Sequence, residues 1–341
     1  MKKAEPLNRY AYIDALRIFA INMVIVLHCI YEYLIDANAD PPLWWAFGVV
    51  NELARTGVPL FFMISGYLLL SSANTLNIKA FYRSRLSKYI LPFLFWDIVY
   101  YCLYRVHNGS RILSFDFFKE LLNNGSAYHL WFMYSIILLY FMLPFVKKAL
   151  DGYDTKIQML FFIIVVFQTT IKPFFNIFFS GKLYIYLADD GIVGYLGYMV
   201  LGYILGKTTF SGFKLWFAGI CGGVACLVFA YCNCQFALSG RGYVFSGGYT
   251  INHYIEAACL FVLFKNFSWE KVKKPLQYAS KLCLSVYFIH VIFIELIGRV
   301  MLSIQGLAPS SFYLVLYVAT AVVSFGTAGV FQYIKNKCTE K

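Results

Sequence analysis

The chain has 341 residues, of which 60% are hydrophobic and only 13% are charged. Soluble domains carry about 25% charged residues, so this composition excludes an ordinary soluble fold. The net charge of +12 can mark a nucleic-acid surface in a soluble protein. Here we attribute it to the cytoplasmic loops of a membrane protein, where Lys and Arg accumulate, and we expect no nucleic-acid partner.

The nine cysteines indicate neither a disulfide scaffold nor a metal site. Most of them lie inside apolar runs, where Cys behaves as a small hydrophobic residue. Cys232 and Cys234 form a single Cys-x-Cys, which lacks the second ligand pair of a zinc site. We predict no metal and no bound cofactor.

Ten apolar stretches have roughly the length of about 20 residues that a helix needs to cross a bilayer. In chain order they cover residues 12–34, 53–72, 87–106, 128–147, 157–178, 190–206, 214–234, 250–266, 280–302 and 312–334. Residues 114–122 show helical spacing but are too short to cross, so we expect them on the membrane surface. The sequence therefore predicts an all-α bundle of about ten membrane-spanning helices. It is expected to form one domain over residues 1–341, with no separate soluble domain.

Lys and Arg are distributed unevenly between the two sides that these spans define. With the N-terminus in the cytoplasm, 19 of them fall on the cytoplasmic side, 6 on the opposite side and 4 inside spans. Positive charge favours the cytoplasmic side, so both termini are predicted to be cytoplasmic. The loops near 36–42, 107–127, 179–189, 235–249 and 303–311 are then predicted to face outward.

The first apolar stretch carries three ionisable residues, Asp14, Arg17 and His28. Such groups are costly in a bilayer and indicate a function by default. Arg17 and His28 are 11 residues apart. Eleven residues turn a helix to within about 20° of a whole number of turns, so the two side chains lie on the same face. They are about 16 Å apart along the helix axis. A cation thus lies near the cytoplasmic mouth and a titratable group in the outer half. Arg17 and Asp14 are also spaced to pair, but that pairing does not account for His28.

Two further segments place polar groups at or near a span. Ser65-Gly66 follows an apolar run, and such a pair favours close helix packing, with Ser65 bonding across the contact. Arg83, Arg85 and Lys88 precede the third span at the cytoplasmic interface. There they either bind phosphates or only set the topology.

Polar residues also occur on the fourth, eighth and ninth spans. His129 and Trp131 open the fourth span at the outer mouth, where an aromatic belt is expected. Tyr287 and His290 lie one helical turn apart on the ninth span. Two pairs are spaced to bond on their own helices, and we interpret both as structural: His253 with Glu256, and Glu295 with Arg299.

Four motifs, in this order, resemble those of the acyltransferase 3 family of membrane acyltransferases. Arg17 and His28 lie in the frame Ile-Asp-x-Leu-Arg-x-x-Ala followed by His. Residues 61–66 give Phe-Phe-x-x-Ser-Gly, 129–131 give His-Leu-Trp, and 285–290 give Ser-x-Tyr-x-x-His. Four motifs in order are far more specific than one. Overall the chain is most similar to bacterial inner-membrane O-acetyltransferases such as those that modify enterobacterial common antigen.

One motif departs from the family pattern. Many members have Arg-x-x-Arg before the third span, where this chain has Arg85-Leu-Ser-Lys88 preceded by Arg83. Lys keeps the positive charge but not the bidentate fork of Arg. A phosphate-binding role therefore survives with a changed geometry.

The resemblance implies transfer of an acyl group, usually acetyl and not amino-acyl, from cytoplasmic acyl-coenzyme A to a hydroxyl of an extracytoplasmic glycan or lipid-linked sugar. His28 would act in catalysis with Arg17, either as a general base or as a covalent acyl carrier. The implied donor-binding residues are Arg83, Arg85 and Lys88. The implied pocket or supporting residues are Asp14, Ser65, His129, Trp131, Tyr287 and His290. The protein would be a multi-pass protein of the bacterial inner membrane, with acyl-coenzyme A, the glycan and lipid as partners.

Two other classes of protein fit parts of the pattern. Intramembrane Asp, Glu and His also occur in proton-coupled secondary transporters, which are commonly built from inverted repeats. No internal repeat is visible in this chain. An intramembrane serine protease would pair Ser65 with His290, but Met63 replaces the first Gly of the expected Gly-x-Ser-Gly frame.

Overall fold

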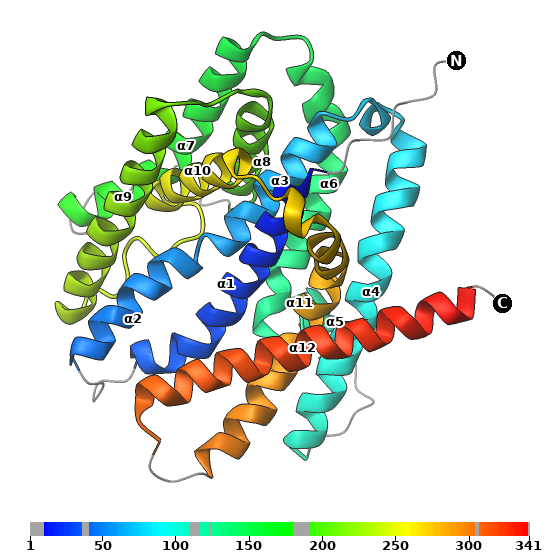
Figure 1. Ribbon diagram of the computed structural model, residues 1–341, viewed down its shortest axis with the longest axis vertical. Coiled ribbons are helices and arrows are strands. Elements are labelled where there is room, and N and C mark those ends of the chain that lie inside the picture. The colour runs from blue at the N-terminus through cyan, green and yellow to red at the C-terminus, as the bar shows by residue number, and fades with distance from the viewer. Residues whose placement is uncertain are drawn as a thin grey trace.

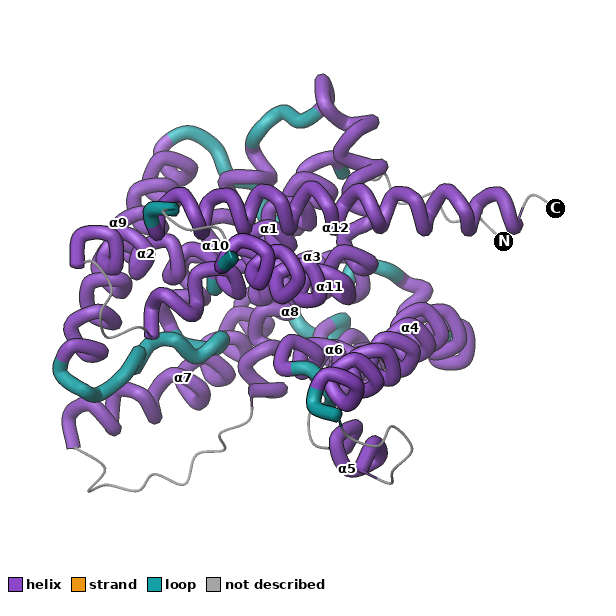
Figure 2. The backbone as a smooth tube through the Cα atoms, turned by 90° about the horizontal axis from the view of Figure 1, so that it is seen from below, coloured by secondary structure: helices purple, strands orange, loops and turns teal. Residues whose placement is uncertain are grey.

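The computed structural model describes residues 10–35, 41–109, 116–122, 125–179, 191–303 and 307–339. Within these residues the chain consists of helices joined by turns and loops, without a strand (Figure 2). The all-α class is therefore confirmed. Parts of the predicted outward-facing segments and of the predicted surface segment 114–122 lie outside the described residues, which lack 1–9, 36–40, 110–115, 123–124, 180–190, 304–306 and 340–341.

Each of the ten predicted spans coincides with a helix. These are α1 (Ala11–Ile35), α3 (Gly57–Leu70), α4 (Ile78–His107), α6 (Trp131–Leu150), α7 (Thr155–Phe179), α8 (Gly191–Lys207), α9 (Phe213–Leu238), α10 (Ile251–Asn266), α11 (Lys273–Leu302) and α12 (Pro309–Thr339). Two more helices are α2 (Pro41–Ala54) and α5 (Asp116–Leu122), and three short 3₁₀ turns are η1 (Ala73–Leu76), η2 (Tyr128–Leu130) and η3 (Glu270–Val272). Within the described residues, 7 helical segments are long and apolar enough to cross a membrane, while Thr155–Thr170 and Gly191–Lys207 are shorter apolar helices.

The start of the second span differs from the prediction. Helix α2 already begins at Pro41, and α2 and α3 follow one another with a break at Arg55 and Thr56. The prediction began at 53 because polar residues interrupt the apolar run there. The structure instead buries Asn51 and Glu52 completely, so these side chains face the protein interior and leave the rest of α2 apolar.

Helix α1 occupies the middle of the bundle (Figure 1). It packs against α2, α3, α10, α11 and α12. Gly57 at the start of α3 allows a close approach, because a Cβ atom there would lie 2.7 Å from the carbonyl oxygen of Ala20. The helix that carries the first motif therefore packs directly on α3 and α11, which carry the second and the fourth.

The closest helix pair is α3 with α8. A Cβ atom on Gly66 would lie 2.0 Å from the Met199 carbonyl oxygen, and one on Gly202 would lie 2.1 Å from the Met63 carbonyl oxygen. Glycine removes the side chain that would hold the two backbones apart. The close packing predicted at Gly66 is thus confirmed, and its partner is α8.

Helices α4 and α12 lie on the outside of this core. Helix α4 packs mainly on α6, whereas α12 packs mainly on α11. In both views the C-terminal part of α12 projects beyond the other helices (Figures 1 and 2). The outer faces of both helices are rich in exposed large apolar side chains, which suits contact with lipid.

Candidate active site

Three histidines from distant parts of the sequence meet beside α1. The ring centroids of His28 and His290 are 5.4 Å apart with the rings stacked, and those of His129 and His290 are 5.2 Å apart. They come from α1, α11 and η2. The sequence placed His28 in catalysis and the other two in the pocket, and the structure brings all three into one cluster.

One hydrogen bond fixes the His290 ring, and another fixes the backbone that carries His129. The Nδ1 atom of His290 lies 2.7 Å from the Tyr287 carbonyl oxygen. Because a carbonyl only accepts, Nδ1 carries the proton and Nε2 of the neutral ring is the basic nitrogen. The Tyr287 hydroxyl in turn donates to the His129 carbonyl oxygen at 2.6 Å. Tyr287 therefore positions both His290 and the short turn that holds His129.

The cluster has unused hydrogen-bonding capacity. Among the described residues, both ring nitrogens of His129 and Nε2 of His290 are buried without a hydrogen-bond partner. His28 is half-buried, and its ring contacts those of His290 and of Tyr128, the latter at 5.0 Å. Buried polar atoms are normally satisfied, so these nitrogens are available to a substrate group or to water.

Arg17 lies on the same side of α1, nearer its N-terminal end. Its Nη1 is 3.4 Å from the Asp14 carboxylate, so the pairing expected from the spacing is present. Asp14 is fully buried and also accepts a hydrogen bond from Ser280 on α11. The charge of Arg17 acts on Cys283, one turn further along α11. Arg17 and His28 therefore share a face of α1, as their spacing predicts, and that face is turned toward α11.

Ser65 is connected to Arg85 of α4 through the side chain of Tyr140. The Ser65 hydroxyl lies 3.3 Å from the Tyr140 hydroxyl on α6, and the Tyr140 ring lies 5.2 Å from that of Tyr89 on α4. The charge of Arg85 acts on Tyr140. Ser65 thus bonds across a helix contact as predicted, and this contact leads toward Arg85.

The three basic residues of α4 are not equivalent. Arg85 is half-buried and its Nε is buried without a hydrogen-bond partner. Arg83 and Lys88 are exposed, and the Lys88 ammonium lies 5.5 Å from the Tyr89 ring centroid. Arg85 therefore points into the protein, whereas the other two form a positive surface around it.

Trp131 does not join the histidines. Its ring packs on Tyr195 of α8 at 5.5 Å and on Phe132 at 6.4 Å. Helical geometry explains this separation, because the turn η2 that carries His129 ends where α6 begins at Trp131. His129 and Trp131 thus leave the chain in different directions.

Sequence reasoning missed two aromatic neighbours of the cluster. Tyr100 lies 4.9 Å from the His129 ring and donates to the Phe288 carbonyl oxygen at 2.7 Å. Tyr128 packs edge-on against His28. Neither residue had a distinguishing signal, because 20% of the chain is aromatic and tyrosines are expected at membrane interfaces.

The two predicted intrahelical pairs have different outcomes. His253 Nδ1 lies 3.2 Å from Glu256 Oε2, so the first pair is confirmed. Glu295 instead accepts from the Tyr104 hydroxyl at 2.9 Å, and Arg299 faces His107 at 3.5 Å. The second pairing was wrong, because α4 supplies partners that the sequence of α11 alone does not reveal.

The fold and this site define a helical protein suited to a membrane, with a histidine cluster inside the bundle and cations at one end. The acyltransferase domain family matches residues 10–329. This match covers nearly the whole chain, which therefore belongs to the acyltransferase 3 family. It is a multi-pass membrane acyltransferase in general character, as the four motifs predicted.

Two curated relatives match a smaller part of the chain. A serine/alanine racemase of Enterococcus gallinarum is 28% identical over 138 residues, which are 37% of this chain and 18% of that protein. An amino-acid racemase of Enterococcus faecalis is 30% identical over 133 residues, with the same two shares. The chain thus matches less than a fifth of the length of either relative. No solved structure matches the chain significantly.

Proposed function

We propose that the protein transfers an acyl group, most simply acetyl, from cytoplasmic acyl-coenzyme A to a hydroxyl of an extracytoplasmic glycan or lipid-linked sugar. The observation that carries this proposal is the arrangement along the α1–α11 contact. Arg17 lies toward one end of this contact, and His28 lies toward the other with the partner-free nitrogens of His129 and His290. A polyanionic donor entering beside the cations would extend its acyl end toward a basic imidazole.

The proposed reaction needs one proton acceptor near the thioester. A ring nitrogen of His28 takes the proton of the acceptor hydroxyl while the hydroxyl oxygen attacks the thioester carbonyl carbon. The carbon–sulfur bond breaks, and the leaving thiolate takes the proton from the imidazolium. Alternatively, a ring nitrogen of His28 attacks the thioester carbonyl carbon first, the carbon–sulfur bond breaks and the thiolate leaves. The acceptor hydroxyl then attacks the acyl-imidazole, its proton passes to the thiolate, and the nitrogen–carbon bond breaks to return the free imidazole. In both routes His290 and His129 present further nitrogens to the reacting groups.

The direct test follows acyl transfer in membranes. Membranes that contain the protein are incubated with acetyl-labelled coenzyme A, and label is measured in the glycan and lipid fractions. We expect label in one of these fractions and none in membranes without the protein. Transport of a solute with no acyl transfer to any glycan would favour the secondary transporter instead.

The protease alternative receives no support from the site. Ser65 lies beside the Tyr140 hydroxyl, whereas His290 bonds to the Tyr287 backbone and stacks on His28. A serine nucleophile needs a base within hydrogen-bond reach. The racemase names describe the two relatives, and because the match covers so little of them we propose no racemase activity for this chain.

We propose that Arg85 contributes more to donor binding than Lys88 or Arg83, because it is the one that points into the protein. Arg85→Ala should raise the apparent KM for acetyl-coenzyme A roughly tenfold, the effect of losing one charge-assisted contact. The effect should be larger at low ionic strength. Lys88→Ala should have a smaller effect, and Arg241→Ala, which removes an exposed cation from another loop, should have none. An unchanged KM in an Arg85→Ala, Lys88→Ala double variant would mean that these charges only set the topology.

We propose that the protein lies in the bacterial inner membrane with both termini in the cytoplasm. This orientation places 19 Lys and Arg on the cytoplasmic side and 6 on the opposite side, as the preference of positive charge for the cytoplasmic side requires. Cys338 is exposed near the C-terminal end of α12. In a variant that keeps only this cysteine, a membrane-impermeant maleimide should label broken cells and not intact ones. Labelling of intact cells would contradict the orientation.

A further inference from the structure

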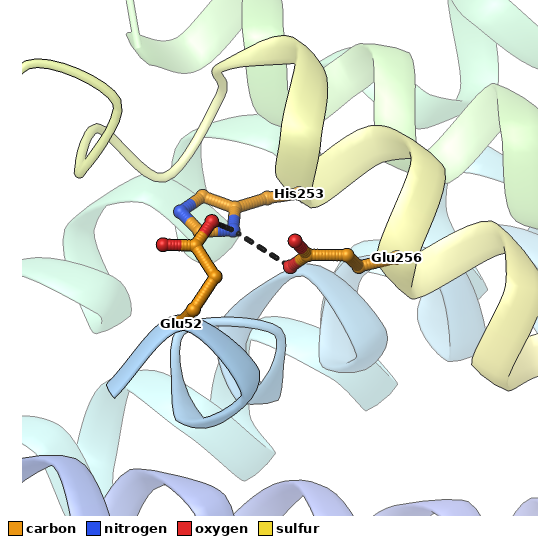
Figure 3. Close-up of side chains that lie close together, drawn as sticks. All are labelled: Glu52, His253 and Glu256. Carbon is orange, nitrogen blue, oxygen red and sulfur yellow. Dashed lines mark hydrogen bonds and ion pairs between the residues drawn. The ribbon is translucent and has the colours of Figure 1, made fainter. Parts of the chain in front are cut away.

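A second buried cluster lies away from the three histidines, where α2 meets α10 (Figure 3). It contains Glu52 from α2 and both His253 and Glu256 from α10. Glu52 and His253 are 0% exposed and Glu256 is 2% exposed. One ligand atom from each side chain lies within 4.8 Å of the other two. Two carboxylates and an imidazole are thus gathered in the protein interior.

The spacing of these atoms fits a shared metal ion. His253 Nδ1 lies 3.2 Å from Glu256 Oε2 and 3.8 Å from Glu52 Oε1. Metal bonds of about 2.0–2.2 Å to nitrogen and oxygen place neighbouring ligand atoms about 3.0 Å apart in octahedral sites and about 3.4 Å apart in tetrahedral ones. The separations therefore suit such a site with small side-chain movements.

The side chains around Glu52 are those expected to orient a ligand carboxylate. Asn233 Nδ2 donates to Glu52 Oε2 at 2.9 Å, and Asn252 Nδ2 donates to Oε1. Asn233 comes from α9 and also accepts from the Phe245 backbone N–H at 2.8 Å. Carboxylates that bind metals are commonly held by outer hydrogen bonds of this kind.

An independent observation points to a missing partner. Glu256 Oε1 and Asn252 Oδ1 are buried with no hydrogen-bond partner, although both residues are almost completely enclosed. The Glu256 carboxylate points toward His253 and Glu52 (Figure 3). Buried carboxylate oxygens without donors are costly, so a cation among Glu52, His253 and Glu256 would supply the partner that Glu256 Oε1 lacks.

The charges of the cluster also require a further positive charge. The positive charge of Arg55 acts on Glu52, and Arg55 Nη1 donates to the Ser246 carbonyl oxygen at 2.7 Å. One guanidinium balances one of the two carboxylates. An uncompensated buried charge is strongly destabilising, so the second carboxylate needs a bound proton or a metal cation.

We propose that Glu52, His253 and Glu256 bind a divalent transition-metal ion of the zinc type, because an imidazole together with carboxylates suits zinc better than magnesium or calcium. The ion would link α2 to α10. This departs from the expectation of no metal, which considered mainly the cysteines. The proposal does not rest on acyl transfer, because metal binding is measured without it.

The first test measures metal in the purified full-length protein. Protein in detergent, freed of loosely bound metal by gel filtration, is expected to contain about one equivalent of transition metal per chain. After removal of the metal with a chelator, titration with Zn²⁺ alone should restore one equivalent and raise the melting temperature. Metal-free protein that takes up no Zn²⁺ would overturn the proposal and would leave a shared proton as the balancing charge.

Matched variants assign the site. Glu256→Gln and Glu52→Gln keep the side-chain size and should lose the stoichiometric metal. Glu295→Gln changes an intramembrane Glu of α11 that bonds to Tyr104 and should keep it. Asn233→Ala should weaken Zn²⁺ binding about 10- to 100-fold, as expected for an outer hydrogen bond. Full metal content in both Glu52→Gln and Glu256→Gln would contradict the assignment even if the unmodified protein contains metal.

Discussion

Replacement of His28 by Ala is expected to reduce acyl transfer about 10²- to 10⁴-fold, the usual contribution of a positioned general base. His28 is the half-buried member of the histidine cluster, and its ring stacks on His290 at 5.4 Å. Removing this ring takes away the proton acceptor or acyl carrier. The surrounding helices keep their backbone contacts. The variant should therefore accumulate in the membrane while label from acetyl-coenzyme A fails to reach the acceptor.

The matched control is His107→Ala. His107 is exposed at the end of α4 and faces Arg299, so its loss should leave transfer unchanged. Arg17→Ala should mainly change how the rate of transfer depends on the concentration of the acyl donor. The reason is that Arg17 lies toward the end of the shared face that is distant from His28. Undiminished transfer in well-expressed His28→Ala membranes would refute the proposed mechanism. Label that stays on the protein in the absence of acceptor would favour an acyl-histidine over a general base.

The helices and the shared face of Arg17 and His28 on α1 could be predicted from the sequence because both depend on local pattern. Long apolar runs identify helices, and the eleven-residue spacing of Arg17 and His28 fixes their shared face. The spacing could not reveal that α11 is their common neighbour. The contact among His28, His290 and His129 depends on the tertiary structure, because nothing in the sequence of residues 129–131 specifies which helix they contact.

Two errors have the same physical origin. Helix α2 was missed because Asn51 and Glu52 look like loop residues when their partners are unknown. In the structure Glu52 accepts from Asn233 and Asn252, more than 180 residues further along the chain. Likewise, the expected partner of Glu295 was replaced by Tyr104. Buried polar residues are satisfied by distant segments, and spacing along one helix cannot reveal them.

The second large effect is expected for the stability of the α3–α8 contact. Gly66→Ala should destabilise the protein by about 1–3 kcal/mol or more, the usual cost of overpacking. A Cβ atom on Gly66 would lie 2.0 Å from the Met199 carbonyl oxygen and 2.4 Å from its Cα. These are backbone atoms of α8 and cannot rotate away, so the helices must separate. The intrinsic preference of helices for Ala over Gly, about 0.5–1 kcal/mol, only partly offsets this cost.

Gly223→Ala on α9 is the matched control, because it makes the same substitution in a helix where nothing lies within 4 Å of the new Cβ atom. Thermal unfolding in detergent should give a lower midpoint for Gly66→Ala and an equal or higher one for Gly223→Ala. Gly202→Ala should resemble Gly66→Ala, since its Cβ atom would lie 2.1 Å from the Met63 carbonyl oxygen. Because both glycines serve one contact, the double variant should lose less than the two single losses added together. A Gly66→Ala midpoint at or above that of the unmodified protein would show that α3 and α8 are not packed backbone to backbone.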